Sequence, residues 1–502
     1  MKYINPIIKG FNPDPSICRV GNDYYLTTSS FEYFPGIPIY HSVDLVNWEL
    51  IGNAISRCNQ LPMDLANSSG GIWAPTIRYN NGVFYITATF SEKGNFIISA
   101  DNPYGEWSEI VWVEMDGIDP SMYFEGSDMY YCANDCGIRS KFHKGEGISL
   151  AKVDVNTGKV IGEMKRIWTG TRGGFLEAPH IYRIGEWYYL IAAEGGTRFN
   201  HMVTIARSKN LWGEYESYAY NPILTNRNDT SKQAMCCGHA DFVDDVNGNW
   251  WAVHLGTRPA VADLSNLGRE TFLIPVTWED EWPKLLNGKS ALSVDAPVKT
   301  EQHIINEVSV DFSGDYFDKK LIFIKSPDFR NYEQADNSLT LYLSTVKITD
   351  QSLSPTFAAV RQMDFECVIQ SEFEFDTKEN GDEAGVAIYL TPKFMYRIFK
   401  VRENGKNYIV VKKIADDFIQ IAYKKEIIDG MVLIKIKADK EKYEFYYAVG
   451  DEDMEYACSA STRFVSCELA GKCFTGTVIG MYAQAECNTD ARAKFNYFKQ
   501  SK

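Results

Sequence analysis

The stretch DPSICRVGNDYYLTT, residues 14–28, joins an Asp-Pro dipeptide to two adjacent tyrosines across a polar turn. Adjacent aromatic residues with similar flanks recur along the first half of the chain, as Tyr24-Tyr25, Phe84-Tyr85, Tyr130-Tyr131, Tyr188-Tyr189 and Trp250-Trp251. Each pair follows a polar or glycine-containing turn, as the second strand of a β-hairpin does. Five similar units in one half of a chain indicate a repeat architecture.

A proline stands nine or ten residues before four of these aromatic pairs, as Pro15, Pro75, Pro120 and Pro179. In the fifth unit Asp241 takes that place, nine residues before Trp250. Five aligned units, each of several short strands, predict a five-bladed β-propeller. The alternative, an antiparallel β-protein that is merely rich in tyrosine, does not account for the constant spacing.

The first strand of each propeller blade lines the central channel. The segments that contain Asp14, Trp73, Asp119, Glu177 and His239 precede the five hairpins, so we expect them to converge there. Each aspartate taken alone is more typical of a turn or a helix cap. Two carboxylates together suit glycosidic bond cleavage, in which one donates a proton and the other activates water or attacks carbon. A third can hold the acid protonated, because neighbouring carboxylates shift each other's pKa.

Aromatic side chains near these carboxylates would pack against the C–H faces of a sugar. Trp73, Phe31 and Phe34 are candidates for that contact.

The second half of the chain has a different pattern. A polar stretch with a proline, SVDAPVKTEQ at 293–302, reads as a linker. Beyond it, FECVIQSEFEF (365–375) and KYEFYY (442–447) alternate apolar and polar residues, which predicts antiparallel strands with one solvated face. We therefore predict an all-β protein, with a propeller at 1–298 and a jelly-roll-like β-sandwich at 309–502. Taken alone, such a sandwich could be a carbohydrate-binding module.

Composition narrows the class of partner. The 502 residues carry a formal net charge of −15, which argues against binding nucleic acid or an anionic membrane. No stretch of about 18 apolar residues predicts a membrane span, and the N-terminal residues lack the apolar run of a signal peptide. The 11 cysteines include no CxxC pair, so we expect free thiols, no zinc knuckle and a cytoplasmic location.

The motifs FNPDPS, GIWAP, GIDPS, EAPHIY, EGGT, GHAD and LGRET, in that order, resemble glycoside hydrolase family 43. The similarity is to its two-domain β-xylosidases and α-L-arabinofuranosidases and covers essentially the whole chain. It implies that Asp14 is the general base, Glu177 the general acid, and Asp119 the residue that orients the acid and modulates its pKa. It also implies inversion at the anomeric carbon, without a glycosyl-enzyme.

The resemblance extends to other residues. Trp73 and Phe31 match aromatic walls of the xylose subsite, and Arg269 matches an arginine that bonds sugar hydroxyls, although a surface role is the alternative. Phe474, in CFTGTVIG, matches a sandwich residue that shortens the pocket, with a place in the core as the alternative. His239 matches a channel histidine that in some members ligates structural calcium or sodium; a hydrogen-bonded core histidine is the alternative. No cofactor is required.

The expected function is therefore an exo-acting, inverting glycoside hydrolase that releases xylose from the non-reducing ends of short β-1,4-xylo-oligosaccharides. Ala178 stands where several xylosidases have glycine, which leaves arabinose release open as a second or main activity. A retaining fructosidase is less consistent, because it needs Asn-Asp-Pro-Asn-Gly and Glu-Cys motifs that this chain lacks. A non-catalytic sugar-binding propeller is the alternative from another class. The expected partner is a small oligosaccharide, and a homo-oligomer stays open.

Overall fold

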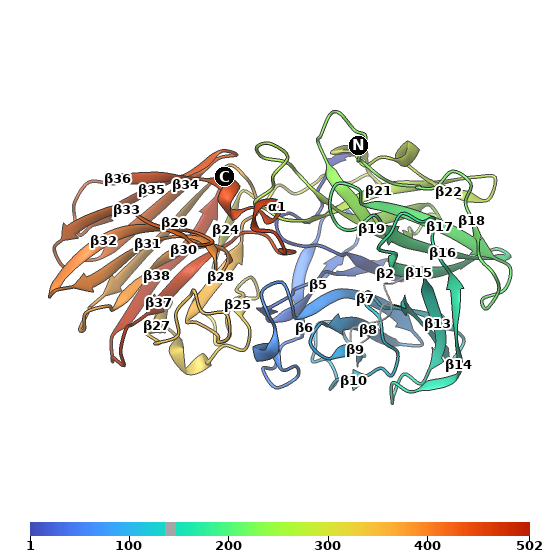
Figure 1. Ribbon diagram of the computed structural model, residues 1–502, viewed down its shortest axis with the longest axis horizontal. Coiled ribbons are helices and arrows are strands. Elements are labelled where there is room, and N and C mark those ends of the chain that lie inside the picture. Colours follow the sequence, from blue (N-terminus) through green and yellow to red (C-terminus); the bar gives the residue numbers. More distant parts are fainter. Residues whose placement is uncertain (136–146) are drawn as a thin grey trace.

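The protein is all-β, with two parts that lie side by side in a computed structural model (Figure 1). The structure describes residues 1–135 and 147–502. Within these ranges the helical elements are single turns: η1 (Met63–Leu65), η2 (Leu286–Gly288), η3 (Phe329–Asn331), η4 (Thr462–Val465) and α1 (Cys467–Ala470). None of the helices in this described part is long and apolar enough to span a membrane.

The first part consists of four-stranded antiparallel sheets, five of them among the described residues. In chain order, the first sheet has β2 (Ser16–Val20), β3 (Asp23–Thr27), β5 (Gly36–Ser42) and β6 (Glu49–Ile55). The second has β7 (Ile72–Asn80), β8 (Val83–Phe90), β9 (Gly94–Ala100) and β10 (Val111–Trp112). The third has β11 (Ser121–Glu125), β12 (Asp128–Asn134), β13 (Ile148–Val153) and β14 (Val160–Trp168). The fourth has β15 (Glu177–Ile184), β16 (Trp187–Glu194), β17 (Met202–Ser208) and β18 (Glu216–Ser217). The fifth has β19 (Met235–Asp244), β20 (Trp250–Thr257), β21 (Glu270–Glu279) and β22 (Trp282–Leu285).

The aromatic pairs lie where the repeat predicts them, in the second strand of each sheet. In the first sheet, for example, Tyr24 is opposite Arg19 and Tyr25 opposite Cys18, across the turn that links β2 to β3. The first strands touch one another in a closed cycle, from β2 to β7, β11, β15, β19 and back to β2. The segments that precede them are therefore brought together, as the repeat predicts.

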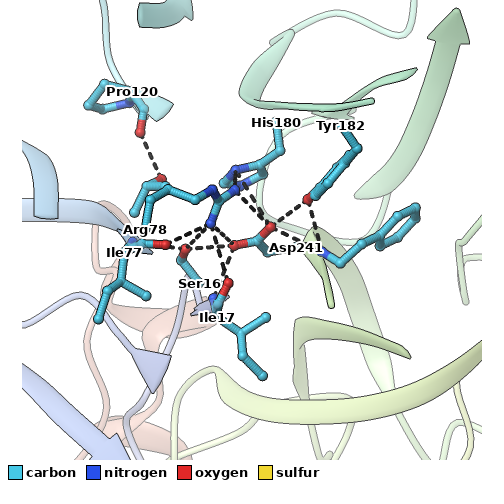
Figure 2. A network of polar contacts seen from close by, with 10 residues as sticks. Ser16, Ile17, Ile77, Arg78, Pro120, His180, Tyr182 and Asp241 are labelled. Atoms are coloured by element: carbon cyan, nitrogen blue, oxygen red, sulfur yellow. Dashed lines mark hydrogen bonds and ion pairs between the residues drawn. The ribbon is translucent and has the colours of Figure 1, made fainter. Parts of the chain in front are cut away.

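A buried ion pair between β7 and β19 is also hydrogen-bonded to β2 and β15 (Figure 2). Arg78 of β7 donates to both carboxylate oxygens of Asp241 of β19, at 2.8 and 3.0 Å. Asp241 also accepts hydrogen bonds from Ser16 of β2, at 2.6 Å, and from Tyr182 of β15. His180 of β15 accepts a hydrogen bond from the same guanidinium, at 2.9 Å between Nη2 and Nδ1.

The carboxylate of Asp241 is fully enclosed, so its charge depends on these donors. Burial alone would raise the pKa of Asp241, but attraction to Arg78 and hydrogen bonds from Arg78 and Ser16 hold that pKa well below its usual range. Burial lowers the pKa of His180 to about 3, so its ring is neutral and can accept the bond from Arg78. A buried pair with its hydrogen bonds satisfied is costly to break, because the remaining charge loses its partner.

The second part is a sandwich of two antiparallel sheets. One contains β26 (Tyr332–Ala335), β27 (Ser338–Tyr342), β38 (Arg492–Ser501), β29 (Cys367–Phe375), β34 (Val432–Ala438), β35 (Lys442–Val449) and β36 (Glu455–Ser461), with β24 (Glu307–Ser309) paired to β38. The other contains β28 (Phe357–Arg361), β37 (Val478–Gln484), β30 (Glu383–Thr391), β31 (Phe394–Glu403), β32 (Lys406–Ala415) and β33 (Phe418–Ile427). The predicted alternation is confirmed in β29, where the residues from Cys367 alternate between buried and partly exposed.

Two short pairings flank the junction between the parts. β1 (Lys2–Ile4) pairs with β23 (Ser293–Asp295), and β4 (Tyr33–Phe34) of the first part pairs with β25 (Phe323–Ile324) of the second. The predicted limits of the two domains, 1–298 and 309–502, stay a prediction.

A hydrophobic cluster crosses the junction. Phe11, Phe31 and Tyr33, all at most 3% exposed, pack with Tyr389 and Phe399 of the sandwich. Apolar burial of this kind stabilises a fixed arrangement of the two parts.

The network around Asp241 predicts a large stability effect. Asp241→Asn removes the charge that compensates Arg78, and we expect it to destabilise the first part by about 3–5 kcal/mol. All 11 tryptophans precede residue 283, so tryptophan fluorescence during urea unfolding reports on the first part alone. Asp244→Asn on the same strand is the matched control, because its pair with Arg19 is partly exposed and should contribute at most about 1 kcal/mol. Equal effects of the two substitutions would contradict a central role for the buried pair.

Candidate active site

Asp14 is held by its backbone and by three side chains. It lies between Pro13 and Pro15 with φ of 54°, a left-handed conformation that is strained for a residue other than glycine. Its Oδ2 accepts a hydrogen bond from the hydroxyl of Ser29, at 2.6 Å, and its Oδ1 accepts one from Arg269, at 2.8 Å. Nδ1 of His239 lies 3.7 Å from the same Oδ1.

These contacts determine the charge of Asp14. The carboxylate is buried, with 5% of the residue exposed, and burial alone would raise its pKa. The Arg269 guanidinium and the hydrogen bond from Ser29 outweigh burial and hold the pKa of Asp14 below its usual value. Asp14 is therefore an anion at neutral pH, with its direction fixed by Ser29 and Arg269.

A left-handed residue occurs at the corresponding place in every one of the five sheets. These residues are Asp14, Ala74, Asp119, Ala178 and His239, with φ between 42° and 54°. The candidate side chains of three sheets belong to the left-handed residue itself, whereas Trp73 and Glu177 come one residue earlier. The fifth unit is also shifted from the expected alignment: Ala240, not Asp241, follows the left-handed residue and takes the place of the prolines. Asp241 instead binds Arg78 in the central network.

The pKa values of the Asp119 and Glu177 carboxyl groups are shifted in the opposite direction from that of Asp14. Burial, repulsion from Glu177 and repulsion from Asp14 raise the pKa of Asp119 well above its usual value, against attraction by Arg269. Burial and repulsion from Asp14 raise the pKa of Glu177 to about 7. Two such groups titrate as a pair. At neutral pH this pair therefore retains a proton, whereas Asp14 does not.

Arg269 contacts Asp14, lowers the pKa of all three carboxyl groups by electrostatic attraction, and bonds to the second domain. Its Nη1 donates to Asp14 at 2.8 Å and to the hydroxyl of Thr197 at 2.9 Å. Its Nη2 donates to the backbone carbonyl of Phe474, in the sandwich domain, at 3.0 Å. Arg269 is only 9% exposed, so the surface alternative for this residue is wrong.

Three of the predicted aromatic residues meet beside Arg269. The ring of Phe474 stacks on Phe31, with centroids 6.1 Å apart, and meets Trp73 edge-on at 6.5 Å. The Arg269 guanidinium lies 5.7 Å from the Phe31 ring centroid and 5.8 Å from that of Phe474. Phe31 is 3% exposed, while Trp73 and Phe474 are half-buried, so the last two retain surface for a ligand.

Phe34 does not belong to this group, and the expectation that it contacts a sugar is wrong. It is 2% exposed and packs in the hydrophobic core, with its ring 6.1 Å from that of Phe329.

The ion considered at His239 would need further ligands. Across residues 1–135 and 147–502, no group of three or more His, Cys, Asp or Glu side chains is arranged to hold a metal ion. Burial, opposed by Asp14, lowers the pKa of His239, so the ring is neutral beside that carboxylate. The donors of these side chains alone do not build a metal site, and the ion at His239 stays a prediction.

Sequence reasoning missed several residues that hold the site. Ser29 binds Asp14 and also accepts a hydrogen bond from the backbone of Ala74, at 2.7 Å, which links the first two sheets. Thr197 supports Arg269 and lies in the EGGT motif, the one sequence signal that pointed to it. Glu194 accepts hydrogen bonds from the backbone of Thr171 and Gly173, in the loop that leads to Glu177.

Comparison with known proteins follows the same division of the chain. The model of glycosyl hydrolases family 43 matches residues 3–283, and that of the beta xylosidase C-terminal concanavalin A-like domain matches residues 309–501. A non-reducing end alpha-L-arabinofuranosidase of Bacteroides ovatus is 39% identical, over 99% of this chain and 94% of the relative. A beta-xylosidase of Bacillus subtilis is 33% identical, over 99% of both chains.

Solved structures agree over the full length. The crystal structure of xylan beta-1,4-xylosidase from Bacillus halodurans has a TM-score of 0.94 at 29% identity and covers 100% of both chains. The protein described as Bacteroides ovatus xyloglucan PUL GH43B has a TM-score of 0.93 at 36% identity and covers 100% of this chain and 99% of that one. With its carboxyl triad and two matching domains, this chain belongs to glycosyl hydrolases family 43.

Proposed function

We propose that the chain is an exo-acting, inverting β-xylosidase that releases xylose from the non-reducing ends of short β-1,4-xylo-oligosaccharides. The observation that carries the proposal is the opposite tuning of its carboxyl groups. Asp14 is an anion stabilised by Arg269, while Asp119 and Glu177 retain a proton between them near neutral pH. Glycoside hydrolysis needs one base and one acid at the same time.

In the proposed reaction Glu177 is the general acid. It donates its proton to the glycosidic oxygen as the bond to the anomeric carbon breaks. Asp14, the general base, accepts a proton from the water whose oxygen attacks that carbon from the opposite face. The sugar leaves with inverted configuration, and the proton gained by Asp14 returns to Glu177 through solvent. For this mechanism the two carboxyl groups should be roughly 6.5 to 9.5 Å apart.

Asp119 is proposed to raise and hold the pKa of Glu177. A second carboxyl group beside the acid disfavours another negative charge there, so Glu177 keeps its proton and stays neutral until the leaving oxygen accepts that proton. Arg269 is proposed to have a double role, as the counter-ion of Asp14 and as a donor to sugar hydroxyls.

The aromatic residues support an exo-acting enzyme. Trp73 is proposed to contact the apolar face of a xylose unit and Phe474 to close the pocket from the sandwich side, with the buried Phe31 at the same subsite supporting the ring of Phe474 on which it stacks. A pocket closed at one end accepts the end of a chain rather than its middle. We further propose that the five sheets are the blades of a five-bladed propeller, whose closed cycle of first strands supports that count.

The cellular setting is part of the proposal. Short oligosaccharides that have entered the cytoplasm are the substrates that fit an exo-acting enzyme there. The free thiols of the described cysteines are compatible with a reducing compartment.

Release of L-arabinose is the second candidate activity. It is favoured by the name of the relative from Bacteroides ovatus, an alpha-L-arabinofuranosidase, and by a xylosidase/arabinosidase of Butyrivibrio fibrisolvens that is 35% identical.

Initial rates on an aryl β-xyloside and an aryl α-L-arabinofuranoside distinguish the two candidates. We expect the higher kcat/KM on the xyloside, with measurable release from the arabinofuranoside. A higher kcat/KM on the arabinofuranoside would make arabinose release the main activity. Binding of xylobiose in a calorimeter without turnover of either substrate would support a non-catalytic sugar-binding protein instead.

The stereochemistry of the first product tests the mechanism. Proton NMR during hydrolysis of a β-linked xyloside should detect α-xylose first, before mutarotation forms the β-anomer. Early accumulation of β-xylose would overturn the inverting assignment and favour a covalent, fructosidase-like route through Asp14.

The role of Glu177 predicts a dependence on the leaving group. Glu177→Ala should lower kcat on xylobiose by about 10²–10⁴-fold, and much less on an aryl xyloside with an acidic phenol, which leaves without a proton. Glu186→Ala, in the turn after β15 with a side chain that is 79% exposed, is the matched control and should keep both activities. Equal losses on the two substrates would contradict the assignment of Glu177 as the acid.

A further inference from the structure

The loop that precedes β7 contains an unusual serine. Ser69 is 4% exposed and left-handed, with φ of 61°. This conformation is strained for a serine, so contacts with neighbouring residues must hold it. Its neighbour Ser68 is exposed.

Each polar group of Ser69 has a separate partner. The backbone N–H donates to Oε2 of the buried Glu32, at 3.0 Å. The backbone carbonyl accepts a hydrogen bond from the indole of Trp73, at 3.1 Å. The hydroxyl oxygen accepts one from the backbone N–H of Phe474, at 3.0 Å. One residue thus links an aromatic residue of the first domain to one of the second.

The same loop also holds Phe31. Backbone hydrogen bonds run in both directions between Phe31 and Ile72, at 3.0 and 3.1 Å. Gly71 makes this close approach possible: a Cβ atom there would lie 2.3 Å from the carbonyl oxygen of Phe31. The three aromatic residues of the candidate sugar pocket are therefore all fixed by residues 69–72.

We propose that Ser69 is a positioning residue that docks Phe474 of the sandwich domain against Trp73 and Phe31 and so sets the size of the sugar-binding pocket. The inference rests on the proposed function, because it places the three rings at the sugar-binding pocket. It adds a residue that does not itself touch the sugar and acts through the ring of Phe474.

The physical basis is the way the peptide of Phe474 is held. Arg269 binds its carbonyl and Ser69 binds its N–H, so both sides of the residue are fixed by the first domain. Loss of either bond frees a loop that reaches across from another domain, and ordering that loop again when sugar binds costs binding free energy. Arg269 cannot test this idea, since it also binds Asp14.

Ser69→Ala is the decisive substitution, because it removes the hydroxyl and keeps both backbone bonds. We expect KM for xylobiose to rise about fivefold, the effect of one hydrogen bond, while kcat stays within about twofold. Ser68→Ala is the matched control: its hydroxyl lies 3.4 Å from Glu32 and has no bond to Phe474, so KM should not change. An unchanged KM in Ser69→Ala, or an equal rise in Ser68→Ala, would overturn the proposal.

A double-mutant cycle separates positioning from general stability. Once Phe474→Ala has removed the ring, adding Ser69→Ala should raise KM no further, because Ser69 acts through that ring. Independent, multiplying effects of the two substitutions would show that Ser69 acts by another route. If Ser69→Ala folds poorly by circular dichroism, Ser69→Gly replaces it, since glycine adopts the left-handed conformation without strain.

Failure of the proposed function gives a different result. A wild-type chain that releases no xylose from xylobiose contradicts the proposed function. An active wild type whose KM is insensitive to Ser69 contradicts only the positioning role.

Discussion

The ion pair between Arg78 and Asp241 is the constraint on which the site depends. Its members and hydrogen-bond partners lie on the first strands of several sheets, as Ser16, Arg78, His180, Tyr182 and Asp241. For each of these strands, a candidate site residue stands a few positions before the residue that joins the network. Asp14, for example, is two residues before Ser16, and His239 is two residues before Asp241. Fixing the strands at this level therefore fixes the residues that precede them.

Above this constraint, burial and one arginine together account for the unequal charges of three carboxyl groups. Arg269 donates directly to Asp14, and a charge-assisted hydrogen bond is far stronger than attraction across a longer distance. Burial raises the pKa of both Asp119 and Glu177, and repulsion from the anion of Asp14 raises both further. The base and the acid are thus tuned by the same contact: stabilising the charge of one group disfavours the charge of its neighbours. A separate counter-ion for each carboxyl group would have removed this difference.

The sequence predicted the sheets and the candidate carboxyl groups well, because the repeat of aromatic pairs reflects hairpins with local pairing. It did not predict which residue of each segment adopts the left-handed conformation, a point on which neighbouring positions differ. Glu177 and Trp73 precede the left-handed residue, whereas Asp14 and Asp119 are that residue. Alanine at 74 and 178 gives no sequence signal for such a conformation, which glycine or asparagine would have indicated. Ser29 and Ser69 were missed for another reason: their roles depend on contacts with residues that are distant in the sequence, and serine is common in turns.

The second domain participates in the site rather than accompanying it. A carbohydrate-binding module would have its own ligand surface and leave the first domain complete. Here Phe474 supplies both a ring against Phe31 and a backbone carbonyl to Arg269. The two domains also share a hydrophobic cluster, in which Phe11, Phe31 and Tyr33 of the first domain are buried together with residues of the sandwich. The pocket and the domain interface are therefore built from the same side chains, so a change in one alters the other.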